Sequence, residues 1–265
     1  MARNPPSGRY TVDAAAKALD LLNTFSFHER RLSLAELANR TGIPRATAFR
    51  LLATLEEAGF VVKESGDYRL GIKLFVLGNV VAADLDVRTV AHPHLVSLRD
   101  GTAETAQIAI LDHGQVVYLE RVLSPRPVGF MRSRAGAILP AYCTGLGKTL
   151  LAYRPETEVT AWAMTQTLKP LTRNTITSLE QLLDELRTIR ARGYGIDQEE
   201  REIGVRCIAA PVRNHEGDVV AAISVAGPSE RMPRTLVGSA MAKLVVAAAQ
   251  EISLELGAVQ ESLVS

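Results

Sequence analysis

The 265-residue sequence has few of the features that mark disulfide-rich, metal-binding or membrane-spanning proteins. Its two cysteines, Cys143 and Cys207, belong to no cluster with the spacing of metal ligands, and they do not make a disulfide framework. No run of eighteen apolar residues could span a membrane, and the polar residues 1–10 do not resemble a signal peptide. We therefore expect a soluble, cytoplasmic protein that uses no metal and no cofactor.

The composition also lacks a strong excess of either charge. The net charge is only +1, and a hydrophobic content of 47% is high enough for well-packed cores. The length predicts two domains. Residues 1–72 contain ten Lys and Arg against eight Asp and Glu, which makes this part slightly basic. This asymmetry favours, weakly, a contact between the N-terminal part and nucleic acid.

Acidic residues are missing from residues 44–55, which lie within the pattern that organises the chain. Ser33 and Glu36 have the spacing of a capping box and predict the start of a helix, and Gly42 favours a sharp turn at its end. Pro44 suits the first turn of a second helix. We expect the buried side of this second helix to consist of Phe49, Leu51, Leu52 and Leu55.

Residues 11–22 and 60–70 complete this first domain. A helix that begins at Thr11 or Asp13 is expected to bury Val12, Ala15, Leu19 and Leu22. Two β-rich segments, residues 60–62 and 68–70, predict a hairpin. A hairpin after two such helices is the wing of a winged helix-turn-helix, and the helix after Pro44 is then its recognition helix.

The candidate DNA contacts follow from this geometry. Residues early in a recognition helix reach base edges in the major groove; Arg binds guanine, and Thr offers a hydroxyl or a methyl group. Cations on the wing can contact phosphates. The candidate residues are Ser33, Arg45, Ala46, Thr47, Arg50, Lys63 and Arg69. The alternative is a solvated helical hairpin with ordinary surface arginines, but the wing and the missing acids favour DNA binding.

The rest of the chain divides at a helix. We expect residues 1–72 to form the winged domain, residues 73–90 a linker helix and residues 91–265 a second domain, with Pro93 as a break. The linker has apolar residues at helical spacing, Leu74, Leu77, Val80 and Val81, and a second copy of the chain is the simplest partner for them.

The second domain is predicted to be α+β with a mainly antiparallel sheet. Expected strands are residues 105–111, 115–122, 128–132, 205–213 and 219–225, with a three-residue loop after the first. Expected helices are residues 144–154, 155–168, 178–192 and 234–256. Residues 197–201 are interpreted as a solvated segment, with Asp197 closest to the strands.

Other functions have weaker support. Residues 145–149 (GLGKT) look like a phosphate loop, but Tyr142 stands where such a loop needs glycine. A catalytic cysteine needs a histidine within reach, and no histidine is tied to Cys207 by a local pattern. His92 and His94 are expected to be a surface pair and not a metal site. A cysteine-dependent cytosolic enzyme, or an architectural DNA-binding protein without a ligand, remain alternatives.

Six segments together resemble the IclR family of bacterial transcriptional regulators. They are LAELANRTGIPRATAFRLLATLEEAGF (34–60), YRLG (68–71), CTGLGKTLLA (143–152), GYGIDQEE (193–200), GVRCIAAPVRN (204–214) and AAISVAGP (221–228). The resemblance implies a winged helix, a linker helix that pairs dimers and a GAF-like effector-binding domain. It also implies that a homodimer or dimer of dimers binds double-stranded operator DNA and responds to a small organic acid or aromatic compound.

The resemblance further implies an effector site. Its residues are Gly136, Leu139, Gly145, Leu146, Asp197, Val205, Cys207 and Ser224. Ala226 stands where some members have a second serine, which favours an effector larger or more apolar than glyoxylate or pyruvate. Arg132 and Arg134 are candidates to neutralise a carboxylate.

Overall fold

The computed structural model describes residues 12–26, 29–83, 86–126 and 134–259. The chain divides into two compact units, Met1–Asp84 and Leu85–Ser265. Within the described ranges, no helix has the length and apolar character needed to cross a membrane.

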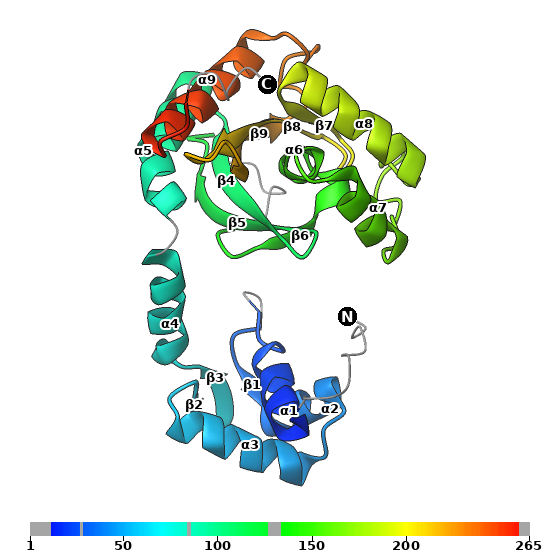
Figure 1. The fold of residues 1–265 in the computed structure, drawn as a ribbon. Coiled ribbons are helices and arrows are strands. Elements are labelled where there is room, and N and C mark those ends of the chain that lie inside the picture. Colours follow the sequence, from blue (N-terminus) through cyan, green and yellow to red (C-terminus); the bar gives the residue numbers. More distant parts are fainter. Residues whose placement is uncertain (1–11, 27–28, 84–85, 127–133, 260–265) are drawn as a thin grey trace. The chain divides into compact units, whose positions relative to one another are not determined.

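The described residues of unit 1 form three helices around a small core, followed by a fourth helix (Figure 1). These are α1 (Asp13–Leu22), α2 (Leu34–Thr41), α3 (Arg45–Glu57) and α4 (Ile72–Ala83). Strands β1 (Leu32–Ser33), β2 (Val61–Glu64) and β3 (Asp67–Leu70) form an antiparallel sheet in the order β1-β3-β2. The core consists of Leu21, Leu32, Leu37, Ala38, Ile43, Ala48, Leu52, Val61 and Tyr68. The predicted winged helix-turn-helix is confirmed.

Local signals set both ends of α2, the first helix of the helix-turn-helix motif. The Ser33 Oγ accepts the Glu36 N–H at 3.3 Å, and the Glu36 carboxylate accepts the Ser33 N–H at 2.8 Å, which confirms the capping box. Gly42 follows α2 with φ +70°, a left-handed conformation that glycine adopts without strain. Together these caps fix the short turn that leads into α3.

Four of the expected core positions in unit 1 are wrong. Val12, just before α1, is 66% exposed, and Ala15 and Leu19 within α1 are exposed as well; Phe49 in α3 is 48% exposed. Helix α1 is apolar on more than one side, and only its Ala16 and Leu21 side is buried, so periodicity alone chose the wrong face.

The expected helix break at Pro93 is also wrong. Pro93 lies inside α5 (Asp86–Thr102), the first helix of unit 2. A proline removes one backbone hydrogen bond from a helix, but burial of Ala91 and Leu95 on the inner side of α5 holds the helix together across it. His92 and His94 each lie beside a different acid, Glu120 for the first and Glu251 and Glu255 for the second.

The described part of unit 2 contains a six-stranded antiparallel sheet in the order β6-β5-β4-β9-β8-β7. Its strands are β4 (Thr105–Asp112), β5 (Gln115–Val122), β6 (Ile138–Pro140), β7 (Gly195–Gln198), β8 (Val205–Arg213) and β9 (Val219–Pro228). The remaining helices are the 3-10 helix η1 (Ala141–Cys143), α6 (Gly145–Ala152), α7 (Glu156–Met164), α8 (Leu179–Arg192) and α9 (Ala240–Glu255). The predicted α+β class is confirmed.

Helices cover both faces of this sheet (Figure 1). On one face α5 and α9 pack on a cluster that includes Ile108, Ile208 and Ile223. On the other, α6, α7 and α8 pack over the small side chains Ala109, Ala209 and Ala222. On this second face the large side chains of the core therefore come mainly from the helices.

Several element boundaries in unit 2 differ from expectation. Asp112 pairs with Gln115, so the β4–β5 loop has two residues, His113 and Gly114, both with positive φ. Strands β6 and β7 were not predicted, β9 continues to Pro228 and α9 begins only at Ala240. The expected strand 128–132 lies outside the described residues.

Helix α6 approaches η1 so closely that Gly147 has no room for a side chain. A Cβ atom there would overlap the backbone of Ala141. We expect Gly147→Ala to lower the free energy of unfolding by about 1–3 kcal/mol, because backbone atoms must move to admit the methyl group.

Gly101→Ala is the matched control for this prediction. Gly101 is also helical, in α5, and a Cβ there would have no atom within 4 Å. Alanine at this position should leave stability unchanged or raise it by up to about 1 kcal/mol. Urea unfolding curves measure both variants; equal stability of the Gly147 variant and the wild type would contradict the close approach.

Candidate functional site

The N-terminal part of α3 presents the predicted DNA contacts to solvent. Arg45, Ala46 and Arg50 are exposed, and Thr47 is half-buried. Within the described part of the chain, no carboxylate lies within ion-pair distance of Arg45 or Arg50, whose charges are therefore not neutralised. The buried side chains of Ala48 and Leu52 anchor the opposite side of α3 in the core. An exposed, uncompensated pair of guanidinium groups on one helix suits contact with DNA.

Of the other three predicted DNA contacts, the side chains of Ser33 and Arg69 already have hydrogen-bond partners in the protein, and that of Lys63 has none among the described residues. The Ser33 Oγ is held by Glu36 in the capping box. Arg69 is half-buried and donates its Nε to Glu64 at 2.9 Å; this hydrogen bond raises the pKa of Arg69 and lowers that of Glu64. The Lys63 Nζ is exposed and lies 5.8 Å from the centre of the Phe49 ring. Lys63 therefore keeps its charge available, beside α3.

The predicted effector residues lie on the α6 side of the sheet in unit 2. Asp197 pairs with Cys207 across β7 and β8, and a Cβ at Gly145 would overlap the Cys207 Sγ, so these three residues touch. Leu146 is a buried residue of α6, and Ser224 lies in the next row of the same sheet face, paired with Ala209.

The remaining predicted effector residues lie at the margins. Val205 is half-buried at the start of β8, and Leu139 pairs with Val116 at the β6 edge. Gly136 is exposed, and its N–H donates to the Tyr118 carbonyl at 2.8 Å. Arg134 is exposed, and Arg132 lies outside the described residues.

The interpretation of residues 197–201 as a solvated segment is wrong. Asp197 is 5% exposed and Glu200 is 6% exposed. Burial, together with the neighbouring Glu200 carboxylate, raises the pKa of Asp197 to about 7. The Asp197 Oδ1 accepts the Glu200 N–H at 2.8 Å. At neutral pH this carboxyl is therefore partly protonated and can donate a hydrogen bond.

Lys148 explains why Glu200 is buried. The Lys148 Nζ is 2.5 Å from the Glu200 Oε1 and 3.3 Å from the Glu185 Oε1, and the lysine is 1% exposed. Burial raises the pKa of Glu200, an effect that the Lys148 charge opposes. The lysine of the GLGKT segment thus serves as a buried ion-pair partner in this fold.

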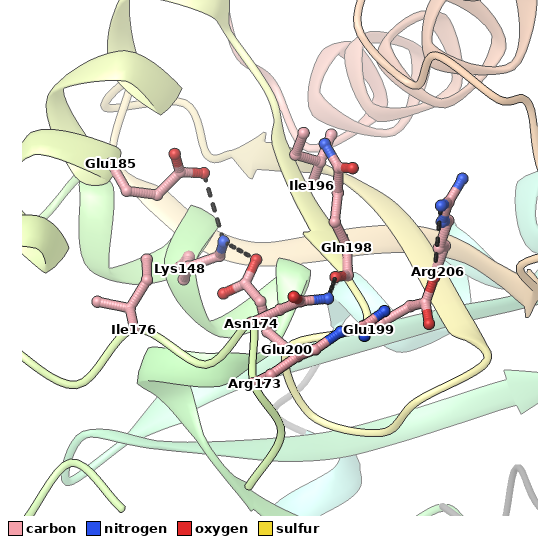
Figure 2. Close-up of a pocket in the computed structure, with 10 residues that line it drawn as sticks. All are labelled: Lys148, Arg173, Asn174, Ile176, Glu185, Ile196, Gln198, Glu199, Glu200 and Arg206. Atoms are coloured by element: carbon pink, nitrogen blue, oxygen red, sulfur yellow. Dashed lines mark hydrogen bonds and ion pairs between the residues drawn. The ribbon is translucent and has the colours of Figure 1, made fainter. Parts of the chain in front are cut away.

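Figure 2 shows the cavity, about 380 Å³ in volume, beside this ion pair. Its described lining carries three cations and three carboxylates, and it lies along β7, beside Ile196 and Gln198. Glu199 pairs with Arg206 at 3.3 Å, and the Asn174 Nδ2 donates to the Gln198 carbonyl (Figure 2). The three cations and three carboxylates of the lining balance, so this cavity has no net charge to attract an ion, and none of the predicted effector residues lines it.

Two polar residues on the α6 side of the sheet, beside the predicted effector residues, were not singled out from the sequence. The Arg121 Nε in β5 donates to the Gln107 Oε1 at 2.9 Å, and the Gln107 Nε2 donates to the Ser224 Oγ at 3.1 Å. Gln107 and Ser224 are 4% and 0% exposed. Their proximity depends on strand register, which no local pattern encodes; the polar positions within otherwise apolar strands were the available signal.

Comparison with known proteins identifies the chain. Residues 80–254 match the model of the bacterial transcriptional regulator IclR C-terminal domain, and residues 14–65 match the IclR helix-turn-helix domain. The chain belongs to the IclR family of bacterial transcriptional regulators. Its role as a DNA-binding transcriptional regulator follows from this membership.

The IclR-family relatives are similar over most of their length. The regulator KdgR of Escherichia coli K12 is 35% identical over 249 residues, 93% of this chain and 94% of KdgR. XynR of the same strain is 34% identical over 223 residues, 83% and 88% of the two chains. The crystal structure of an IclR homologue from Microbacterium hydrocarbonoxydans, complexed with 4-hydroxybenzoate, has a TM-score of 0.82 at 27% sequence identity. The match covers 92% of this chain and 99% of the homologue.

Both thiols should be unreactive in the folded chain. Burial raises the pKa of Cys143 to about 12 and raises that of Cys207 well above its ordinary value. Because the thiolate is the nucleophile, we expect no alkylation by iodoacetamide at pH 8, and two alkylations after unfolding in urea. Intact-mass spectrometry measures both; stoichiometric modification of the folded chain would support a cysteine-dependent enzyme instead.

Asp197→Asn should change how stability depends on pH. With its pKa raised from 3.8 to about 7, folded Asp197 keeps a proton that the unfolded chain releases between about pH 4 and pH 7. The free energy of unfolding therefore falls as pH rises through this window.

Asparagine carries no such proton and retains the oxygen that accepts the Glu200 N–H. We expect the free energy of unfolding of the variant, relative to that of the wild type, to rise by about 1 kcal/mol per pH unit between roughly pH 5 and pH 7. Urea unfolding at four pH values gives the difference between the two proteins, in which the titration of Glu200 largely cancels. A difference that does not vary with pH would show that Asp197 is ionised throughout.

Proposed function

We propose that this IclR-family regulator binds a palindromic operator as a homodimer or dimer of dimers. When an effector binds unit 2, the regulator dissociates from the operator or changes its arrangement on it. The observation that carries the DNA-binding part is the exposed N-terminal face of α3, where Arg45 and Arg50 lie without acidic neighbours within the described ranges. Two such helices, one from each copy, would enter successive major grooves of the operator.

Roles within the DNA contact follow from chemistry. Arg45 and Arg50 can each bind a guanine through two hydrogen bonds, and Thr47 can contact thymine or a base edge. Lys63 is suited to a phosphate. Arg69 would have to share its guanidinium between Glu64 and a phosphate, and Ser33 would contribute from the N-terminal end of α2, where the helix dipole favours an anion.

Self-association is supported by the apolar surface of α4. Ile72, Phe75, Val76 and Leu77 are 73%, 67%, 55% and 44% exposed. A contiguous apolar surface of this kind marks an interface, and a second copy of the same helix is a self-complementary partner. In this proposal residues 1–72 bind DNA, residues 73–90 link and pair the copies, and residues 91–265 bind the effector and contribute to assembly.

The effector is proposed to bind where Gly145, Asp197, Cys207 and Ser224 gather on the α6 face of the sheet. The related Microbacterium structure, which is complexed with 4-hydroxybenzoate, supports a small organic acid or aromatic compound as the ligand class. Such a ligand would act by binding one arrangement of the dimer more tightly than another, which shifts their populations.

Arg50→Ala tests the DNA-binding face. Loss of a base-reading arginine costs about 1–3 kcal/mol, so we expect operator affinity to fall roughly 10- to 100-fold in gel-shift titrations, with little change on unrelated DNA. The control is Lys17→Ala, which removes an exposed cation of α1 that is paired with Asp13. Equal affinity of the Arg50 variant and the wild type would remove Arg50 from the set of base contacts.

A further inference from the structure

We infer that Arg121 binds the carboxylate of the effector, with Gln107 as a positioning residue, so that the regulator responds to carboxylic acids and not to neutral molecules of the same shape. The inference rests on the proposed effector site and names the class of compound that it takes.

Strand register places Arg121 on the effector face. Gln107 pairs with Arg121 on one side and with Ser224 on the other, and Ser224 pairs in turn with Ala209. Residues opposite one another in neighbouring strands point to the same side of a sheet. Because Ala209 packs against the α6 side, the whole row faces α6.

The guanidinium group of Arg121 is held in place but left incomplete. Its Nε is fixed by the Gln107 Oε1, which is itself fixed because the Gln107 Nε2 donates to Ser224. The Arg121 Nη2 is shielded from solvent and has no hydrogen-bond partner among the described residues. A positioned donor without an acceptor is a group that a ligand can satisfy.

The charge of Arg121 is also uncompensated. The described residues place no carboxylate within ion-pair distance of it, and burial lowers its pKa while arginine stays protonated. Removing a cation from water without a counter-charge is costly. A carboxylate matches the planar fork of a guanidinium with two parallel hydrogen bonds, whereas a neutral amide or hydroxyl would leave the charge unpaired.

The neighbouring row offers the complementary group. Asp197 pairs with Cys207 and Cys207 with Ala226, one row beyond Ser224 on the same face. The side chains on this face include the small Ala209, Ala226 and Ser224, and the buried Tyr118, which interacts electrostatically with both Arg121 and Asp197. An acid bound at Arg121 could place a hydroxyl or carbonyl group toward Asp197, whose partly protonated carboxyl does not compete for the guanidinium.

The first experiment compares acids with their amides. Thermal-shift titrations of the full chain use 4-hydroxybenzoate, benzoate and pyruvate, each beside 4-hydroxybenzamide, benzamide and pyruvamide. We expect at least one acid to raise the melting temperature and to bind at least 10-fold more tightly than its amide. Equal effects of acid and amide, or no stabilisation by any of the acids, would overturn the inference.

Variants locate the effect at Arg121. Arg121→Gln should weaken binding of the stabilising acid about 10- to 100-fold, as expected for loss of a hydrogen bond to a charged group, and should leave the affinity for the amide little changed. Arg121→Lys should restore part of the loss. Arg187→Gln, on the exposed surface of α8, removes an arginine paired with Glu156 and should leave both affinities unchanged. Full acid affinity in Arg121→Gln would overturn the inference.

A ligand-free measurement separates binding from a structural role. If Arg121 awaits an anion, Arg121→Met should leave the melting temperature of the ligand-free chain unchanged or raise it, because an unpaired charge is removed. A large decrease would mean that Arg121 stabilises the fold, and would count against the inference.

Operator gel shifts with the same compounds distinguish two kinds of failure. If amides change operator binding as strongly as acids do, the regulator is ligand-responsive and only carboxylate recognition fails. If acids bind with the expected preference but none alters operator binding, the proposed ligand response fails while recognition by Arg121 stands.

Discussion

The burial of a single ammonium group, that of Lys148, is the constraint on which much of unit 2 depends. A buried lysine needs acidic partners, because its desolvation is otherwise uncompensated. Glu200 and Glu185 supply them from the segment after β7 and from α8. Any arrangement that separated α6 from these elements would leave charges buried and unpaired. The same Glu200 donates its backbone N–H to Asp197, so this ion pair also fixes a carboxyl group of the proposed effector site.

Absent side chains matter as much as this ion pair. Cβ atoms at Gly145, Gly147 and Gly195 would overlap Cys207, Ala141 and Thr149 respectively. These contacts bring the N-terminal turn of α6 directly onto β7 and β8, where it buries Cys207. The polar row of Arg121, Gln107 and Ser224 lies further along the same face, over β5, β4 and β9. On this face of the sheet, α6 therefore fills the part over β7 and β8, and the part over β5, β4 and β9 keeps unused hydrogen-bonding capacity.

The elements that could be predicted from the sequence are those with local signals. The capping box at Ser33, the turn at Gly42 and the strand-forming runs of β4, β5 and β8 depend on residues within a few positions of one another. The short strands β6 and β7 were missed because three or four residues carry too little periodicity. Pro93 was misjudged because tertiary packing of α5 outweighs one lost hydrogen bond.

The site was predicted less completely than the fold. Family resemblance supplied Gly145, Asp197, Cys207 and Ser224, which the structure places on one face. Arg121 and Gln107 could not be found in this way, since their contact depends on the register between β4 and β5 and on the bulge near Ile108. The exposed apolar residues of α1 and α3 could not be predicted from the sequence either, because a helix with apolar residues on several sides does not reveal which side meets the core.

The two margins of the sheet in unit 2 have a consequence for solubility. Its outermost strands, β6 and β7, have three and four residues, whereas the four inner strands have eight to ten. An outer strand exposes unpaired backbone groups that can recruit strands of other molecules. Here both outer strands are short, and in β7 the Gln198 carbonyl accepts a hydrogen bond from the Asn174 side chain. The long strands β4 and β9, which have long neighbours on both sides, are thereby kept in the interior of the sheet.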